Sequence, residues 1–140
     1  MPTIRKEFTV TAGLDSVWAA FRDTGAVHRV LAPGFVTDCR LEEGGAARIV
    51  TFANGIVARE AIVDLDDAAH RLAYSASGGR LTHHNASFTV TEDGPGRCRI
   101  VWQADLLPAG MKPAIEAMME QGVAAMEREL GQRQLGGPTA

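Results

Sequence analysis

The chain has 140 residues, of which 46% are hydrophobic and 22% are charged, and its formal net charge is -3 at pH 7. This length predicts one domain with its own buried core, and the negative charge argues against nucleic acid or an anionic membrane as the main partner. The sequence contains no apolar run of the roughly 20 residues that a membrane-spanning helix needs, so we expect no membrane insertion.

The first thirty residues predict one strand and two short helices. Residues 3–11 alternate, which is typical of a half-buried strand with Ile4, Phe8 and Val10 on its inner side and Lys6 in the same row. The charged, alternating residues 1–10 do not read as a secretory signal. Four apolar residues then follow at helical spacing: Leu14, Val17, Trp18 and Phe21. Residues 26–31 are expected to form one more short helical turn.

From residue 35 onward the sequence predicts six antiparallel strands. Glycine, asparagine and aspartate mark the turns between them, and Asn54-Gly55 is the strongest hairpin signal. A sheet with one apolar face must be covered, so the helices are expected to pack on the same concave side and give an α+β fold. The predicted strands span residues 35–41, 46–52, 56–65, 71–76, 81–91 and 97–107.

Residues 111–130 predict a long amphipathic helix. Its apolar residues recur at three- and four-residue steps: Ile115, Met118, Met119, Gly122, Val123, Met126 and Leu130. Methionine fills irregular gaps, so this face either packs in the core or meets a variable ligand. Gly131 stands where a helix normally stops. We therefore expect a single domain over residues 1–132 and a flexible tail over 133–140.

The register of the Asn54-Gly55 hairpin decides which side chains face inward. A three-residue loop, 53–55, places Arg48 opposite Glu60 and Val50 opposite Ala58, whereas a two-residue loop places Ile49 opposite Glu60. The first register gathers more apolar bulk on one face and pairs opposite charges, so we prefer it.

Four polar residues interrupt the apolar inner wall that this register predicts: Arg48, Glu60, Tyr74 and His84. Arg48 and Glu60 could be a structural ion pair, Tyr74 a core aromatic residue and His84 a satisfied wall histidine. As a set, however, converging polar groups in an apolar cavity are typical of a small-molecule site. The candidate ligand contacts are these four residues with Phe52, Ala58, Phe88, Trp102, Met118 and Gly122.

The sequence gives no reason to expect a metal or another cofactor. His83 and His84 are adjacent in a predicted strand and therefore point to opposite faces, and neither His28 nor His70 has zinc-type spacing. The two cysteines, Cys39 and Cys98, are far apart, so we read them as idle thiols of a protein in the reducing cytoplasm.

Four short motifs follow one another along the chain: Val17-Trp18, Gly45-Ala46-Ala47-Arg48, Arg59-Glu60 and Leu65-Asp66-Asp67. Taken in this order, they resemble the START and birch-pollen-allergen superfamily, and more narrowly the bacterial polyketide cyclase/dehydrase-type lipid-transport proteins. Residues 65–90 are also similar to the plant abscisic acid receptors.

The resemblance implies a helix-grip fold, in which a curved antiparallel sheet of six to seven strands wraps around the C-terminal helix and leaves a hydrophobic ligand cavity. By position it also implies that Glu60, Tyr74 and His84 face this cavity. The loop at residues 53–55 is shorter than the gate of the receptors and lacks its Leu-Pro pair, and His84 stands where a tyrosine is usual. These departures favour a carrier or an enzyme over a hormone receptor.

Two functions follow as hypotheses. In the first, the protein binds a small, largely hydrophobic molecule as a carrier or sensor, Arg48 takes a carboxylate or carbonyl, and His84 or Tyr74 takes a hydroxyl. In the second it is a cyclase or dehydratase, with Glu60 as base and His84 or Tyr74 as acid. An interaction domain is a third class that nothing in the sequence selects, and monomer and homodimer both stay open.

Overall fold

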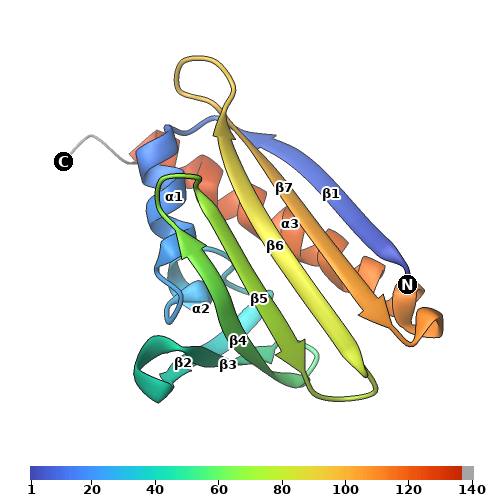
Figure 1. Ribbon diagram of the computed structural model, residues 1–140. Coiled ribbons are helices and arrows are strands. Elements are labelled where there is room, and N and C mark those ends of the chain that lie inside the picture. The colour runs from blue at the N-terminus through green and yellow to red at the C-terminus, as the bar shows by residue number, and fades with distance from the viewer. Residues whose placement is uncertain (137–140) are drawn as a thin grey trace.

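Seven antiparallel strands form one curved sheet in the order β1-β7-β6-β5-β4-β3-β2. The computed structural model describes the backbone of residues 1–136 and the side chains of residues 1–131. In Figure 1 the long strands β1, β7, β6 and β5 run side by side across the sheet. The strands are β1 (Thr3–Val10), β2 (Val36–Glu42), β3 (Ala47–Phe52), β4 (Val57–Asp66), β5 (Arg71–Ser77), β6 (His83–Glu92) and β7 (Cys98–Leu107).

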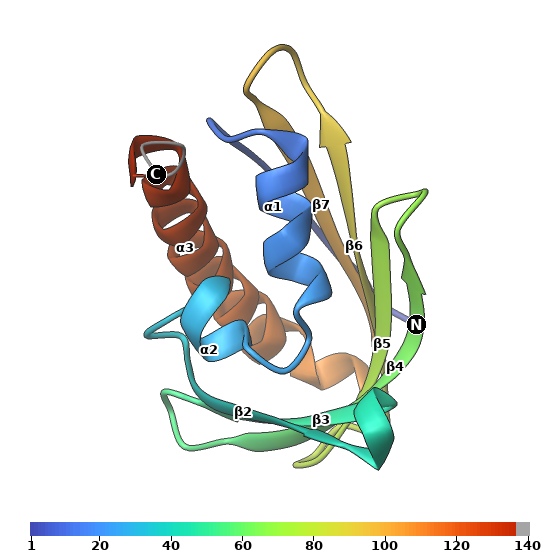
Figure 2. The same ribbon diagram turned by 90° about the vertical axis from the view of Figure 1, so that its left-hand side faces the viewer.

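The three α-helices of residues 1–136 cover the concave side of this sheet, as Figure 2 shows. They are α1 (Leu14–Arg22), α2 (Val27–Val30) and α3 (Lys112–Gly136), with short 3-10 turns at Glu43–Gly45 and Ala109–Met111. The expected α+β class and helix-grip architecture are therefore confirmed, with β1 bringing the sheet to seven strands.

The hairpin between β3 and β4 has the predicted three-residue loop. Arg48 lies opposite Glu60 and Val50 opposite Ala58. The Phe52 N–H donates to the Ile56 carbonyl at 2.8 Å, and Gly55 has a φ of 90° that favours glycine. This register turns Arg48 and Glu60 toward the helices.

The α3 helix packs against β1. Lys6, in the inward row of β1, reaches Glu116 at 3.2 Å and Glu120 at 3.1 Å and so joins the first strand to this helix. The helix does not stop at Gly131 as predicted but continues to Gly136, since Gly131 does not take the positive φ of a helix-ending glycine. Of the predicted tail, residues 137–140 lie outside the described residues.

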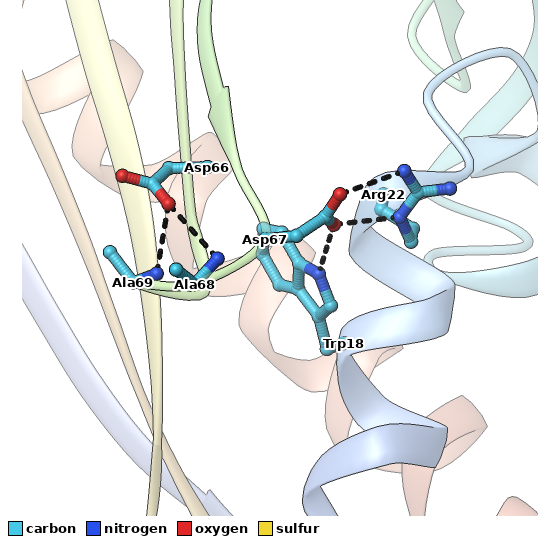
Figure 3. A network of polar contacts seen from close by, with 6 residues as sticks. All are labelled: Trp18, Arg22, Asp66, Asp67, Ala68 and Ala69. Carbon is cyan, nitrogen blue, oxygen red and sulfur yellow. Dashed lines mark hydrogen bonds and ion pairs between the residues drawn. The ribbon is translucent and has the colours of Figure 1, made fainter.

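A polar cluster on α1 holds the turn between β4 and β5 (Figure 3). The Trp18 indole N–H donates to Asp67 Oδ1 at 2.8 Å, and Arg22 donates from Nε at 2.8 Å and from Nη2 at 3.1 Å to the same carboxylate. The neighbouring Asp66 accepts from the backbone N–H groups of Ala68 and Ala69, which fixes the turn itself. The cluster thus fastens α1 across one end of the sheet.

This cluster makes stability depend on pH in the acid range. The hydrogen bonds of Arg22 and Trp18 lower the pKa of Asp67 to about 2. A carboxyl group whose pKa is lower in the folded state stabilises the fold above its unfolded pKa of about 4, and that stability disappears as the pH falls toward about 2. We expect Asp67→Asn to lower the urea midpoint at neutral pH and to have little effect near pH 2. An equal loss at both pH values would contradict this assignment.

Candidate ligand-binding cavity

A cavity of about 160 Å³ lies between the concave face of the sheet and helices α2 and α3. An apolar cavity of about 150 Å³ in another protein binds a benzene-sized molecule. The cavity therefore has the volume for a single ring, and its opening toward solvent leaves room for a substituent.

Aromatic rings form one wall of the cavity and methionines form the other. Phe88 stacks on Trp102 with ring centroids 4.8 Å apart and on Tyr74 at 6.1 Å, so three strands present one nearly continuous aromatic surface. Phe35 and Phe52 add an edge-to-face pair at 5.3 Å. The side chains facing them come from the start and middle of α3 and from the turn before it: Met111, Ile115, Met118, Met119 and Met126.

The only charged side chains that are buried in residues 1–131, Arg48 and Glu60, form a pair at one end of the cavity. The Arg48 Nε–H donates to Glu60 Oε1 at 2.8 Å, and its Nη1 donates to the Thr24 carbonyl at 3.3 Å. The guanidinium also lies 5.4 Å from the centre of the Tyr74 ring, a cation–π distance. We call Arg48, Glu60 and Tyr74 the inner end, because all three are at most 6% exposed.

Tyr74 and His84 bring neutral polar groups to the same space. The Tyr74 hydroxyl accepts the Trp102 indole N–H at 3.1 Å, which leaves its own hydrogen available to a ligand. Burial raises the pKa of Tyr74, so it stays a protonated donor at neutral pH. Burial also lowers the pKa of His84, and its buried Nδ1 has no hydrogen-bond partner in the described residues. The imidazole is therefore neutral at pH 7.

The more exposed residues of the lining lie on two loops and near the N-terminal end of α3, and we infer that the cavity opens there. The β5–β6 loop contributes Gly78, Gly79, Arg80 and Leu81 to the lining, and the residue after the β3–β4 loop, Ile56, is 47% exposed. Asn54 Nδ2 lies 3.9 Å from Met118 Sδ, so the β3–β4 loop touches α3 at this opening.

Nine of the ten residues expected to contact a ligand line this cavity: Arg48, Phe52, Ala58, Glu60, Tyr74, His84, Phe88, Trp102 and Met118. Gly122 does not. A Cβ atom on Gly122 would lie 2.9 Å from Trp102 Cζ3 and 3.0 Å from Phe35 Cε2, so the space beside this glycine is filled by two rings. The glycine allows close packing of the helix on the sheet and leaves no free volume there.

Sequence reasoning missed the lining that comes from α2 and the β5–β6 loop. Val27, Leu31 and Phe35 close one side, and Arg80 lies at the opening. The sequence offered two signals, the apolar spacing of residues 27–35 and the Gly78-Gly79 pair before Arg80. Neither signal predicts that these residues line a cavity.

Within residues 1–131 no cluster of three or more histidine, cysteine, aspartate or glutamate side chains could hold a metal ion. Cys39 and Cys98 are free and buried. No helix in the described part of the chain is long and apolar enough to cross a membrane.

The fold matches solved structures of several kinds. A START superfamily protein from Mycobacterium smegmatis aligns with a TM-score of 0.72 at 16% identity, covering 93% of this chain and 97% of that one. An aromatase/cyclase from Streptomyces sp. R1128 aligns with a TM-score of 0.73 at 18% identity, covering 99% and 98%. Norcoclaurine synthase from Thalictrum flavum, in complex with dopamine and hydroxybenzaldehyde, aligns with a TM-score of 0.72 at 19% identity, covering 99% and 89%.

At these identities the structural matches show a shared fold. A search of curated proteins finds no match to this sequence. The family model for polyketide cyclase / dehydrase and lipid transport, in contrast, matches residues 1–131. The chain therefore belongs to the polyketide cyclase / dehydrase and lipid transport family.

Proposed function

We propose that the protein binds a small, largely hydrophobic molecule in this cavity, as a carrier or sensor. The observation that supports this most strongly is the composition of the lining. An aromatic wall faces four flexible methionines, and polar groups are concentrated at one end. A core without a ligand role would be expected to fill a space of this size, because voids in cores lower stability. The free thiols of Cys39 and Cys98 fit a cytoplasmic location.

A variant that fills the cavity tests the proposal. Ala58 lines the cavity from β4, and Ala61, on the same strand, does not. With 4-ethylphenol as a one-ring probe, we expect Ala58→Phe to weaken binding about tenfold or more, because the new ring occupies the ligand volume. Isothermal titration calorimetry measures this, and Ala61→Phe serves as the control. Unchanged affinity in Ala58→Phe would place the probe elsewhere and contradict the proposal.

Acid–base catalysis of the cyclase or dehydratase kind is the second candidate, because Glu60, Tyr74 and His84 all line one space. Neutral His84 can accept a proton and Tyr74 can donate one, and their ring centroids are 6.2 Å apart. The Arg48 Nε–H already donates to Glu60 Oε1, so one of the two oxygens that could act as a base is occupied. Dehydration of a β-hydroxy ketone that is lost in Tyr74→Phe, with binding retained, would favour this candidate over a carrier.

A further inference from the structure

The inner end of the cavity holds one positive and one negative side chain, and their charges cancel. Arg48 and Glu60 are 4% and 6% exposed, and their hydrogen bond at 2.8 Å joins a full positive charge to a full negative charge. The pair is formally neutral, and Tyr74 and His84, which line the same cavity, are neutral as well. A ligand group that reaches this end therefore meets no net charge.

A carboxylate at this position would be poorly compensated. It would approach the Arg48 guanidinium only in the company of the Glu60 carboxylate, so attraction to one nearly cancels against repulsion from the other. The ligand carboxylate would also lose its hydration in an otherwise apolar cavity, and the pair would not repay that loss. A hydroxyl or carbonyl group escapes this penalty, because it needs only a hydrogen bond.

Partners for such a neutral group are present. The Tyr74 hydroxyl has a hydrogen to donate, and Arg48 uses only Nε and Nη1 in its hydrogen bonds to the described residues. The Glu60 hydrogen bond uses Oε1. Donors and an acceptor thus meet at one place, which suits a hydroxyl or a carbonyl.

Among the described residues, one further charged side chain lines the cavity. Arg80 is exposed at the opening, and it makes no ion pair with any of residues 1–131. Solvent screens this cation, so it attracts an anion only weakly. An anionic group on a ligand keeps its hydration beside this exposed cation and would lose it at the inner end, so it would remain at the opening.

From this charge arrangement we propose that the cavity selects ligands whose inner group is an uncharged hydroxyl or carbonyl, such as a phenol or a ketone, and rejects carboxylates at that position. The inference rests on the proposed binding function and specifies its ligand class. Arg48 and Glu60 are specificity-determining residues in this account, and the hypothesis that Arg48 takes a ligand carboxylate is replaced by a carbonyl or hydroxyl contact.

Two probes of matched shape test the proposal by calorimetry. At pH 7 4-ethylphenol is neutral and 4-ethylbenzoate is an anion. In the variant Arg80→Gln, an anion can no longer be held at the opening. We expect this variant to bind 4-ethylphenol at least about tenfold more tightly than it binds 4-ethylbenzoate. Equal affinities for the two probes in Arg80→Gln would overturn the proposal while leaving a binding cavity in place. Failure of both probes to bind would contradict the binding function itself.

The variant Glu60→Gln reverses the charge argument. It keeps the side-chain size and removes the negative charge, so a ligand carboxylate can then pair with Arg48. We expect 4-ethylbenzoate to bind about tenfold more tightly than it binds to wild-type protein and to raise the melting temperature of this variant. An unchanged preference for the phenol in folded Glu60→Gln would count against the proposal, and the comparison in Arg80→Gln stands even where this variant does not fold.

Discussion

Arg48→Met is expected to lower the free energy of unfolding by about 3–5 kcal/mol, because it leaves the Glu60 carboxylate buried without its cation. Glu60 is 6% exposed, and Arg48 supplies its hydrogen bond in the described residues. Loss of Arg48 also removes the donor to the Thr24 carbonyl and the cation over the Tyr74 ring. Urea unfolding, followed by circular dichroism, measures the difference.

Two controls separate burial from charge. Arg59, on the opposite face of β4, pairs with Glu42 and Glu43 but is 39% exposed, so Arg59→Met is expected to cost less than about 1 kcal/mol. The double variant Arg48→Met/Glu60→Leu removes both charges and is expected to recover most of the lost stability. Equal losses of unfolding free energy for Arg48→Met and Arg59→Met would contradict the claim that burial makes the Arg48–Glu60 pair more important for stability than an exposed pair.

Gly122→Leu is expected to lower the free energy of unfolding by about 1–3 kcal/mol through overpacking. Even a Cβ atom at this position would lie 2.9 Å from Trp102 and 3.0 Å from Phe35, so the rings or the helix must move. Because Trp102 stacks on Phe88, the displacement would also disturb the aromatic wall and weaken 4-ethylphenol binding. Thermal unfolding and calorimetry on the same variant measure both effects.

The same helix provides a matched control. Gly131 lies inside α3, and a Cβ atom there would meet nothing within 4 Å. Gly131→Leu should therefore raise stability by up to about 1 kcal/mol, since leucine has the higher helix propensity. If both substitutions raised the stability, the prediction that a side chain at position 122 is overpacked against the two rings would be wrong.

Local sequence rules predicted the part of the site that lies on β3 and β4. Alternation determined which residues share a face, and the Asn54-Gly55 signal located the hairpin. The apolar bulk on one face and the pairing of opposite charges then favoured the register that places Arg48 opposite Glu60. Tyr74 and His84 follow from the same alternation on β5 and β6. Such contacts are predictable because hydrogen bonding along a sheet leaves few choices.

The remaining features depend on how distant elements meet. The sequence marks Gly122 as small, but only the packing of α3 on Trp102 and Phe35 decides that rings, and not a ligand, lie beside it. The contact of Trp18 with Asp67 joins residues 49 positions apart through the placement of α1. Helix ends are likewise ambiguous, because Gly131 can either end a helix or continue it.

Methyl NMR of protein labelled at its five methionines tests the central claim, that the cavity holds a small hydrophobic ligand, most directly. Met111, Met118, Met119 and Met126 line the cavity, whereas Met1 is 68% exposed and lies outside the lining. Titration with 4-ethylphenol is expected to shift the four cavity methyl signals along one saturable curve and to leave Met1 in place. Four unmoved cavity signals, or a shift of Met1 equal to theirs, would contradict a ligand in this cavity.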